Sequence, residues 1–118
     1  MSQAFDDLVS LVARLRAPDG CPWDQRQTHE SLKPYLIEEA YEVIEALDQN
    51  DPNQLLQELG DLFLQILLHA KIEDELRNFS IEQVITTLSQ KLTRRHPHVF
   101  GSDRKTEQTL NAEEVLNQ

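Results

Sequence analysis

Two pairs of acidic residues in the middle of the sequence have a spacing that suits metal chemistry. Glu39 lies three residues before Glu42, and Glu58 lies three residues before Asp61. On a helix, this spacing places two side chains on the same face, with their Cβ atoms about 5–6 Å apart. If two neighbouring antiparallel helices carry the two pairs, four carboxylates meet. The spacing therefore predicts a site for a divalent cation.

The helix expected to carry the second pair is apolar around most of its circumference. Between Leu55 and Ile72 its polar side chains fall mostly in one narrow stripe, which contains Glu58, Asp61, Gln65 and His69. Such a helix is normally buried, and an isolated buried charge is costly. Neither lysine nor arginine occurs between Ile37 and Ala70. Mg²⁺, which prefers hard oxygen ligands, is the natural compensation.

Other interpretations of these acids stay open at this point. The first pair, together with Glu38 and Glu45, also fits a solvated charged face of its helix. The second pair also fits a position beside the positive end of the helix dipole, or at an edge that reaches solvent. A di-iron bundle is a further use of helical carboxylates, but it expects Glu-x-x-His. The sequence contains no Glu-x-x-His.

Local signals predict the helices that would position these acids. Apolar spacing from Phe5 to Leu15 predicts a first helix that ends near Arg16. A turn-rich connection follows, and Asp24 with Gln27 predicts the capping box of the next helix start. The second long helix is expected from about Ser31 or Pro34 to Leu47.

The third helix has the strongest start signal, because Asp51 precedes Pro52 and Gln54 stands at the third helical position. We expect this helix to run to about Leu76. Ser80 with Gln83 predicts the start of a fourth helix, which continues to Arg95 before Pro97 stops it.

No segment shows sustained strand alternation, so the predicted fold is all-α, a helical bundle. We expect one domain over residues 1–118. Residues 101–118 are predicted to form a loop and, from Asn111, the start of a truncated helix.

Composition excludes some classes of function. A net charge of −10 argues against binding to a nucleic acid backbone. No apolar run approaches the roughly 20 residues that span a bilayer, so we expect no membrane segment. The N-terminus lacks the basic region of a signal peptide. A single cysteine, Cys21, suits a reducing cytoplasm, where we expect the protein to lie.

The ordered set of motifs resembles the MazG-type nucleotide pyrophosphohydrolases. Glu38-Glu39-Ala40-Tyr41-Glu42, followed by Glu58-Leu59-Gly60-Asp61, is similar to the family pattern E-E-x-x-E…E-x-x-D. Gly20-Cys21-Pro22-Trp23-Asp24 and the following Gln27-Thr28-His29 resemble the stretch that precedes it. Arg95-His96-Pro97-His98-Val99-Phe100 resembles the stretch after the last core helix. The resemblance covers most of the chain, from about Leu11 to Gly101.

The resemblance implies a helical bundle completed by dimerisation, as a homodimer or homotetramer. It implies hydrolysis of a nucleoside or deoxynucleoside triphosphate to the monophosphate and pyrophosphate. The expected reaction is attack of a metal-bound water between the α- and β-phosphates. The expected metal is Mg²⁺, with Mn²⁺ as a substitute, and its implied ligands are Glu39, Glu42, Glu58 and Asp61.

Further residues are candidates for catalysis and substrate binding. Glu38, Glu39 and Glu42 are the catalytic candidates, with Glu38 either as a base that orients the water or as a neighbour that supports the metal ligands. The resemblance matches Lys91 and Arg95 with residues that contact phosphates. Arg94 fits the same use, or an interaction with the helix C-terminal dipole. Trp23 fits stacking on the base, or a hydrophobic plug in its turn.

Two different functions stay as alternatives. The nearest resemblance is to the N-terminal copy of two-domain MazG proteins, so the chain also fits a non-catalytic helical dimerisation or regulatory copy. A related all-α pyrophosphohydrolase with a narrower substrate, such as dUTP or phosphoribosyl-ATP, is the third hypothesis.

Overall fold

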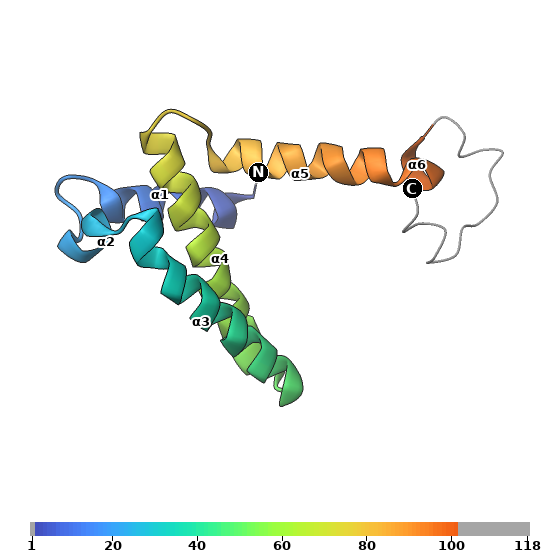
Figure 1. The fold of residues 1–118 in the computed structure, drawn as a ribbon, viewed down its shortest axis with the longest axis horizontal. Helices are drawn as coiled ribbons and strands as arrows, with labels where there is room; N and C mark the ends of the chain where they lie inside the picture. The colour runs from blue at the N-terminus through green and yellow to red at the C-terminus, as the bar shows by residue number, and fades with distance from the viewer. Residues whose placement is uncertain (1, 102–118) are drawn as a thin grey trace. The chain divides into compact units, whose positions relative to one another are not determined.

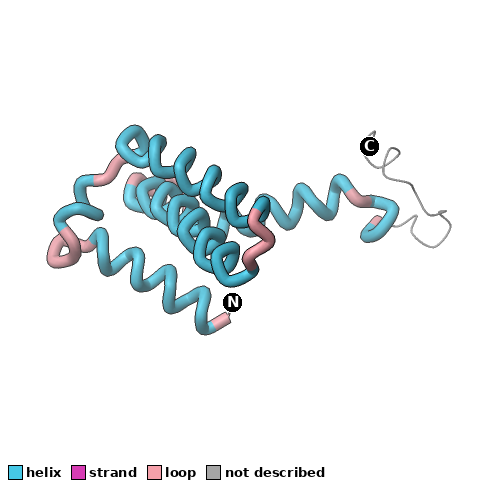
Figure 2. The backbone as a smooth tube through the Cα atoms, turned by 90° about the horizontal axis from the view of Figure 1, so that it is seen from below, coloured by secondary structure: helices cyan, strands magenta, loops and turns pink. Residues whose placement is uncertain are grey.

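The computed structural model describes residues 2–101, and within this range it consists of helices joined by short loops, without strands (Figures 1 and 2). The prediction of an all-α fold is confirmed. The chain divides into two compact units, Met1–Ile81 and Glu82–Gln118. The first unit contains α1 (Gln3–Arg16), α2 (Pro22–Arg26), α3 (His29–Asp48) and α4 (Pro52–Glu75).

The start of α3 differs from the sequence prediction. Thr28 is the N-cap: its side chain accepts a hydrogen bond from the backbone N–H of Ser31, and Ser31 Oγ accepts one from the backbone N–H of Thr28. The predicted box at Asp24 and Gln27 is wrong, because Pro22 opens the short helix α2 and Asp24 lies inside it. Sequence reasoning missed the true box because it uses a serine where glutamate or glutamine is usual.

Helix α3 therefore begins at His29 and includes Pro34. Proline has no N–H to donate to the carbonyl four residues earlier, which normally breaks a helix interior. Pro34 lies only two turns from the helix start, on an exposed part of the chain. The missing hydrogen bond leaves a carbonyl that water can reach, so the helix continues.

A tight turn joins α3 to α4. Asn50 takes the left-handed backbone conformation with φ 54, which asparagine tolerates better than most residues. Its N–H donates to the Leu47 carbonyl, and the Asp51 N–H donates to the Ala46 carbonyl, the pattern of a Schellman ending. Asp51 then caps α4 by accepting from the N–H groups of Asn53 and Gln54. The predicted start of α4 at Pro52 is confirmed.

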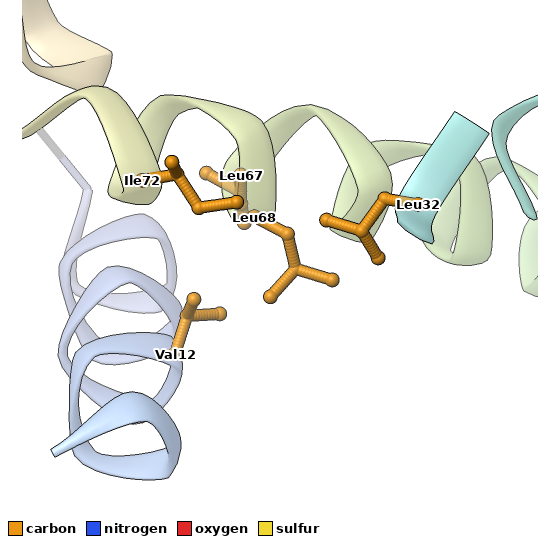
Figure 3. Close-up of a cluster of buried hydrophobic side chains, with 5 residues drawn as sticks. All are labelled: Val12, Leu32, Leu67, Leu68 and Ile72. Atoms are coloured by element: carbon orange, nitrogen blue, oxygen red, sulfur yellow. The ribbon is translucent and has the colours of Figure 1, made fainter. Parts of the chain in front are cut away.

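The turn makes α3 and α4 an antiparallel hairpin whose helices lie side by side in both views (Figures 1 and 2). The helix α1 packs against α4 and α2. A small core forms where α1, α3 and α4 meet, and Figure 3 shows Leu68 of α4 between Val12 of α1 and Leu32 of α3. Leu67 and Ile72 complete the buried cluster.

Only the second half of α4 is covered by this core. Leu67, Leu68 and Ile72 are buried, whereas Leu56 is 73% exposed and Leu59 is 49% exposed. The single chain therefore leaves much of the first half of α4 exposed. The physical reason is that α3 covers one side of the first half of α4, and α1 contacts the core around the second half.

The described part of the second unit contains α6 (Pro97–Phe100) and all of α5 (Ile81–Arg95) except its first residue. The predicted end of α5 at Arg95, before Pro97, is confirmed, and the short α6 was not expected. The predicted loop after Gly101 and the helix start at Asn111 lie outside the described residues. Among residues 2–101, no helix combines the length and apolar character needed to cross a membrane.

Truncating the central core residue tests this packing. Leu68 is 1% exposed, so Leu68→Ala should lower the free energy of unfolding by about 2–5 kcal/mol through lost burial and a cavity. Leu11→Ala on α1, where Leu11 is 55% exposed, is the matched control and should change stability by no more than about 0.5 kcal/mol. Urea unfolding followed by circular dichroism measures both. Equal effects of the two substitutions would contradict the core assignment.

Candidate metal centre

The hairpin brings the two acidic pairs together. Glu39 and Glu42 on α3, and Glu58 and Asp61 on α4, each place a carboxylate oxygen within 4.8 Å of the others. Asp61 is exposed, and the other three are half-buried. The antiparallel course of α3 and α4 sets the first pair opposite the second. We call these four residues the carboxylate cluster.

Like charges at this separation repel, and the cluster responds by holding protons. A hydrogen bond with Glu42, burial, and the negative charges of Glu42, Asp61 and Glu39 raise the pKa of Glu58 to about 7. Burial and the charges of Glu42 and Asp61 raise the pKa of Glu39. Without a cation, therefore, Glu58 holds its proton up to about neutral pH.

Two oxygens of the cluster are buried without a hydrogen-bond partner. They are Oε2 of Glu39 and Oε2 of Glu58. None of the salt bridges found in residues 2–101 involves a cluster carboxylate. A buried acceptor without a partner carries a desolvation cost. These oxygens are hard ligands on facing helices, so the donor set fits a divalent cation such as Mg²⁺.

Glu38 is close to the cluster in sequence but is not part of it. Its side chain is exposed, and its charge contributes to the raised pKa of Glu39. A role of Glu38 as a base therefore stays a prediction, as does the catalytic role of Glu39 and Glu42.

Trp23 lies on α2 and is 44% exposed. Its ring meets Tyr35 of α3 edge to face, with ring centroids 5.9 Å apart and an interplanar angle of 80°. This contact fits the interpretation of Trp23 as a plug in its turn, while the exposed part leaves room for a stacking ligand. Its use in base binding stays a prediction.

The three basic candidates lie towards the end of α5 in the second unit. Lys91, Arg94 and Arg95 are exposed. Arg94 and Arg95 stand in the last helical turn, where positive charge interacts favourably with the helix dipole. Their contact with phosphate stays a prediction.

Sequence reasoning missed the role of Arg16. Its side chain is only 8% exposed and forms two 2.9 Å hydrogen bonds with the carboxylate of Glu75 at the end of α4. It also donates to the backbone carbonyls of Asp24 and Gln27. Arg16 therefore ties α1 to α4 and to the segment just before α3. The sequence offered no local signal for this contact, because Glu75 is 59 residues away.

Sequence reasoning also left two histidines outside the candidate site. His29 at the start of α3 and His69 on α4 place their Nδ1 atoms 2.7 Å apart. A signal for His69 was present, because it follows Asp61 and Gln65 at four-residue steps on the polar stripe of α4. No local signal linked it to His29.

Comparison with known proteins identifies the family to which this arrangement belongs. Residues 27–100 match the model of the MazG nucleotide pyrophosphohydrolase domain. The matched range includes the whole carboxylate cluster. A solved structure, the crystal structure of a mazG-related protein from Thermotoga maritima, has a TM-score of 0.75 and 28% sequence identity. The match covers 95% of this chain and 92% of that one.

Curated relatives share more of the sequence. The chain is 59% identical, over 97 residues, to the nucleoside triphosphate pyrophosphohydrolase/pyrophosphatase MazG of Thermotoga maritima. It is 43% identical, over 113 residues, to the nucleoside triphosphate pyrophosphohydrolase of Escherichia coli strain K12. These matches cover 82% and 95% of this chain, but only 38% and 41% of the relatives.

The predicted resemblance is thus confirmed over most of the chain by sequence and by fold. The chain spans less than half the length of the curated relatives it matches. With the family model covering the hairpin and all four clustered carboxylates, this chain belongs to the MazG nucleotide pyrophosphohydrolase family.

Proposed function

We propose that the chain hydrolyses nucleoside or deoxynucleoside triphosphates to the monophosphate and pyrophosphate, with Mg²⁺ as cofactor. The observation that carries this proposal is the carboxylate cluster, four acids within 4.8 Å of one another in a MazG-family hairpin. The names of two relatives, nucleoside triphosphate pyrophosphohydrolases, support the same reaction.

Mg²⁺ fits the cluster better than a softer metal does. All four side chains offer oxygen, and no histidine or cysteine belongs to the group among the described residues. Mg²⁺ favours carboxylates, retains waters and is often bound through substrate phosphates as well. Mn²⁺ accepts the same ligands and is the expected substitute. The exposed Asp61 leaves one side of the cluster open to a phosphate.

The bound ion would neutralise phosphate charge and lower the pKa of water at the cluster. Glu39, Glu42, Glu58 and Asp61 would hold it. Glu38, or a cluster carboxylate not fully used as a ligand, would accept the proton of the attacking water. Lys91, Arg94 and Arg95 would stabilise negative charge on the leaving pyrophosphate. Trp23 would contact the base.

Activity of the purified chain tests the reaction. With Mg²⁺, nucleoside triphosphates should release pyrophosphate rather than orthophosphate, and EDTA should abolish the release. Glu42→Gln and Asp61→Asn should each lower kcat/KM by at least about 100-fold, since even residues that only support metal ligands cost 10–100-fold when changed. A panel of the common ribo- and deoxyribonucleotides ranks the substrates.

Glu45→Gln is the matched control for these variants. Glu45 lies on α3 one turn beyond Glu42, is exposed and does not belong to the cluster. Its substitution should leave the activity within about 3-fold of the wild type, as expected for a solvated surface charge. Orthophosphate as the first product would contradict the proposed bond cleavage. No release by a folded, Mg²⁺-loaded chain would favour the non-catalytic alternative.

The raised pKa of Glu58 gives the metal-free chain a specific pH dependence. The folded chain holds this proton more tightly than the unfolded chain, for which the ordinary value is 4.5. Protonation therefore stabilises the fold, and this stability is lost as the pH rises from 4.5 to about 7. Over that range, the Tm of the wild type should fall relative to the Tm of Glu58→Gln. Thermal unfolding in EDTA at a series of pH values measures the difference.

Stabilisation of the fold by Mg²⁺ should increase with pH, whereas stabilisation by the proton decreases. The reason is that Mg²⁺ competes with the proton for the same oxygens. Its addition should raise the Tm of the wild type more at about pH 7.5 than at about pH 5, and only slightly in Glu58→Gln. Parallel pH profiles of the two proteins in EDTA would show that Glu58 does not carry the shifted proton.

We also propose that the chain assembles as a homodimer, or as a tetramer of two dimers, through the exposed apolar side chains of the hairpin. Ile37, Tyr41 and Ile44 share one face of α3 and are 59%, 65% and 50% exposed. Leu59 and Ile66 share one face of α4 and are 49% and 42% exposed. Rows of exposed apolar side chains on a helix face are typical of an interface.

Gly60 on α4 supports close approach of another chain. A glycine inside a helix costs roughly 0.5–1 kcal/mol relative to alanine. Apart from its two chain neighbours and the nearby backbone of α4 itself, no atom of the described residues lies within 4 Å of the place where its Cβ would stand. The packing within the described part of the single chain therefore does not require a glycine at this position. A helix of a partner chain that packs closely against α4 here would require one.

Light scattering after gel filtration tests the assembly. The wild type should elute as a dimer or tetramer, and Tyr41→Glu with Leu59→Glu should shift it to the monomer, since two buried charges are costly at an apolar interface. Leu11→Glu on α1, where Leu11 is also exposed, should leave the assembly unchanged. A monomeric wild type at about micromolar concentration would contradict the proposal.

A further inference from the structure

His29 and His69 form a direct contact between the first turn of α3 and the second half of α4. Their ring planes are parallel within 3°, and the ring centroids are 5.0 Å apart. The two Nδ1 atoms are only 2.7 Å apart. Because these nitrogens are much closer than the centroids, the rings meet edge to edge through them. A hydrogen bond with one shared hydrogen fits this geometry, since two N–H groups cannot face each other at that distance.

The neighbours of His29 set the direction of this hydrogen bond. Glu73 Oε1 lies 3.2 Å from His29 Nε2, and a carboxylate only accepts, so Nε2 carries a hydrogen. In neutral His29 the other nitrogen, Nδ1, is then the acceptor, and His69 Nδ1–H donates to it. Asn78 fixes Glu73 in turn: its side chain donates to Oε2 at 2.8 Å, and its backbone N–H donates to the Glu73 carbonyl at 3.0 Å.

His69 is held in its neutral form by its surroundings. With a hydrogen on Nδ1, its Nε2 is a bare acceptor, and this atom is buried without a hydrogen-bond partner. A proton added there would be a buried donor without an acceptor, which is costly. Burial and the neighbouring His29 accordingly lower the pKa of His69. The pair is therefore a fixed contact at neutral pH and above.

This contact lies at the opposite end of the hairpin from the turn. The eight residues from Asp61 to His69 span about 12 Å of helix. Between the two sites, α3 meets α4 through apolar side chains such as Leu32 and Leu68. Apolar contacts are non-directional, whereas the hydrogen bond of the histidines fixes both distance and orientation. The carboxylate cluster itself resists closure, because its charges repel.

We propose that His29 and His69 are positioning residues that fix the register of α3 on α4, and that this register sets the divalent-metal affinity of the carboxylate cluster. The proposal rests on the proposed metal binding. With the pair in place, the two acidic pairs stand opposite each other before a cation arrives. Without the histidine pair, the helix segments that carry the repelling carboxylates separate more easily. Part of the binding free energy of the cation is then used to bring them together, so its affinity is lower.

Mg²⁺ binding by calorimetry at about pH 8 tests the metal half of this proposal. In His69→Gln the amide replaces Nε2 and cannot reach the Nδ1 of His29, so the Kd should rise about 10-fold, the low end of the range for groups that support metal ligands. In His69→Asn the amide nitrogen takes the place of Nδ1 and can donate to His29. Its Kd should return to within about 3-fold of the wild type.

Val12→Ala separates positioning from a general loss of stability. Val12 is 2% exposed and packs in the core between α1 and α4. Its side chain has no polar group and takes no part in the hydrogen bond between the histidines. Its substitution should lower the Tm at least as much as His69→Gln does, through a core cavity. It should leave the Kd for Mg²⁺ unchanged.

A metal-free double-mutant cycle tests the contact itself. His29→Gln, His69→Gln and the double variant are compared with the wild type by thermal unfolding in EDTA at about pH 8 and about pH 5. We expect a coupling between the two positions at the higher pH. It should be smaller at the lower pH, because the stability that depends on neutral His69 is lost as the pH falls from 6.5, its ordinary value, through its lowered pKa in the folded chain.

Other ionisable groups belong to the elements packed at this end of the hairpin. They are Arg16 on α1, Asp24 on α2, Glu30 on α3, and Lys71, Glu73, Asp74 and Glu75 on α4. Arg16 and Glu75 form their own ion pair. Since all of these groups are present in every protein of the cycle, titration that does not depend on both histidines together cancels from the coupling.

The outcomes are distinguishable. Equal Kd values for the wild type and His69→Gln, or an equal increase in Val12→Ala, would overturn the positioning role. A coupling that is zero, or the same at both pH values, would overturn the shared hydrogen bond. A folded wild type that binds no Mg²⁺ would overturn the proposed function and the metal half together, and the cycle would still decide whether the histidines fix the helices.

Discussion

Repulsion among four carboxylates is the constraint around which the helical hairpin is organised. Glu39, Glu42, Glu58 and Asp61 meet within 4.8 Å, and no lysine or arginine occurs between Ile37 and Ala70 to balance them. Below about pH 7 the metal-free chain reduces the repulsion, because Glu58 holds a proton there. A divalent cation would remove the repulsion more completely. It would neutralise negative charge and would also bind the two buried oxygens that have no hydrogen-bond partner.

Such a cluster is stable only if both ends of the hairpin are fixed. At the near end, the left-handed Asn50 and the cap formed by Asp51 allow α4 to turn back directly along α3. At the far end, Leu32 and Leu68 pack in the core, Arg16 ties α1 to Glu75, and His29 of α3 contacts His69 of α4. The contacts at the two ends of the hairpin therefore set the relative positions of the four acids before a cation binds, as a preorganised site requires.

The end of α4 shows that this arrangement has a cost. Arg77 takes a left-handed conformation with φ 65, which costs a non-glycine residue about 1 kcal/mol or more. In return, the chain reverses so that the Asn78 N–H reaches the Glu73 carbonyl and the Asn78 side chain reaches the Glu73 carboxylate. Glu73 is thereby held against His29. Strain at one residue thus supports a chain of hydrogen bonds that ends at His69.

The sequence by itself determined the features that depend on neighbours within a few residues. The start of α4 at Pro52 followed from Asp51, the end of α5 followed from Pro97, and the two acidic pairs followed from their three-residue spacing. These signals are local, because caps, prolines and same-face pairs act within one helical turn. Their strength also varies: the serine in the box at Thr28 was too unusual to be recognised, and Asp24 was taken in its place.

Only the tertiary structure decided which helices meet and in what register. It joined Arg16 to Glu75 across 59 residues and His29 to His69 across 40. It also decided that the single chain leaves Leu56 and Leu59 exposed in the first half of α4. No local pattern specifies these outcomes, because they follow from the packing free energy of the whole unit. An apolar residue in the sequence indicates a side chain that favours burial. It does not show whether the surface that buries this side chain comes from the same chain or from another one.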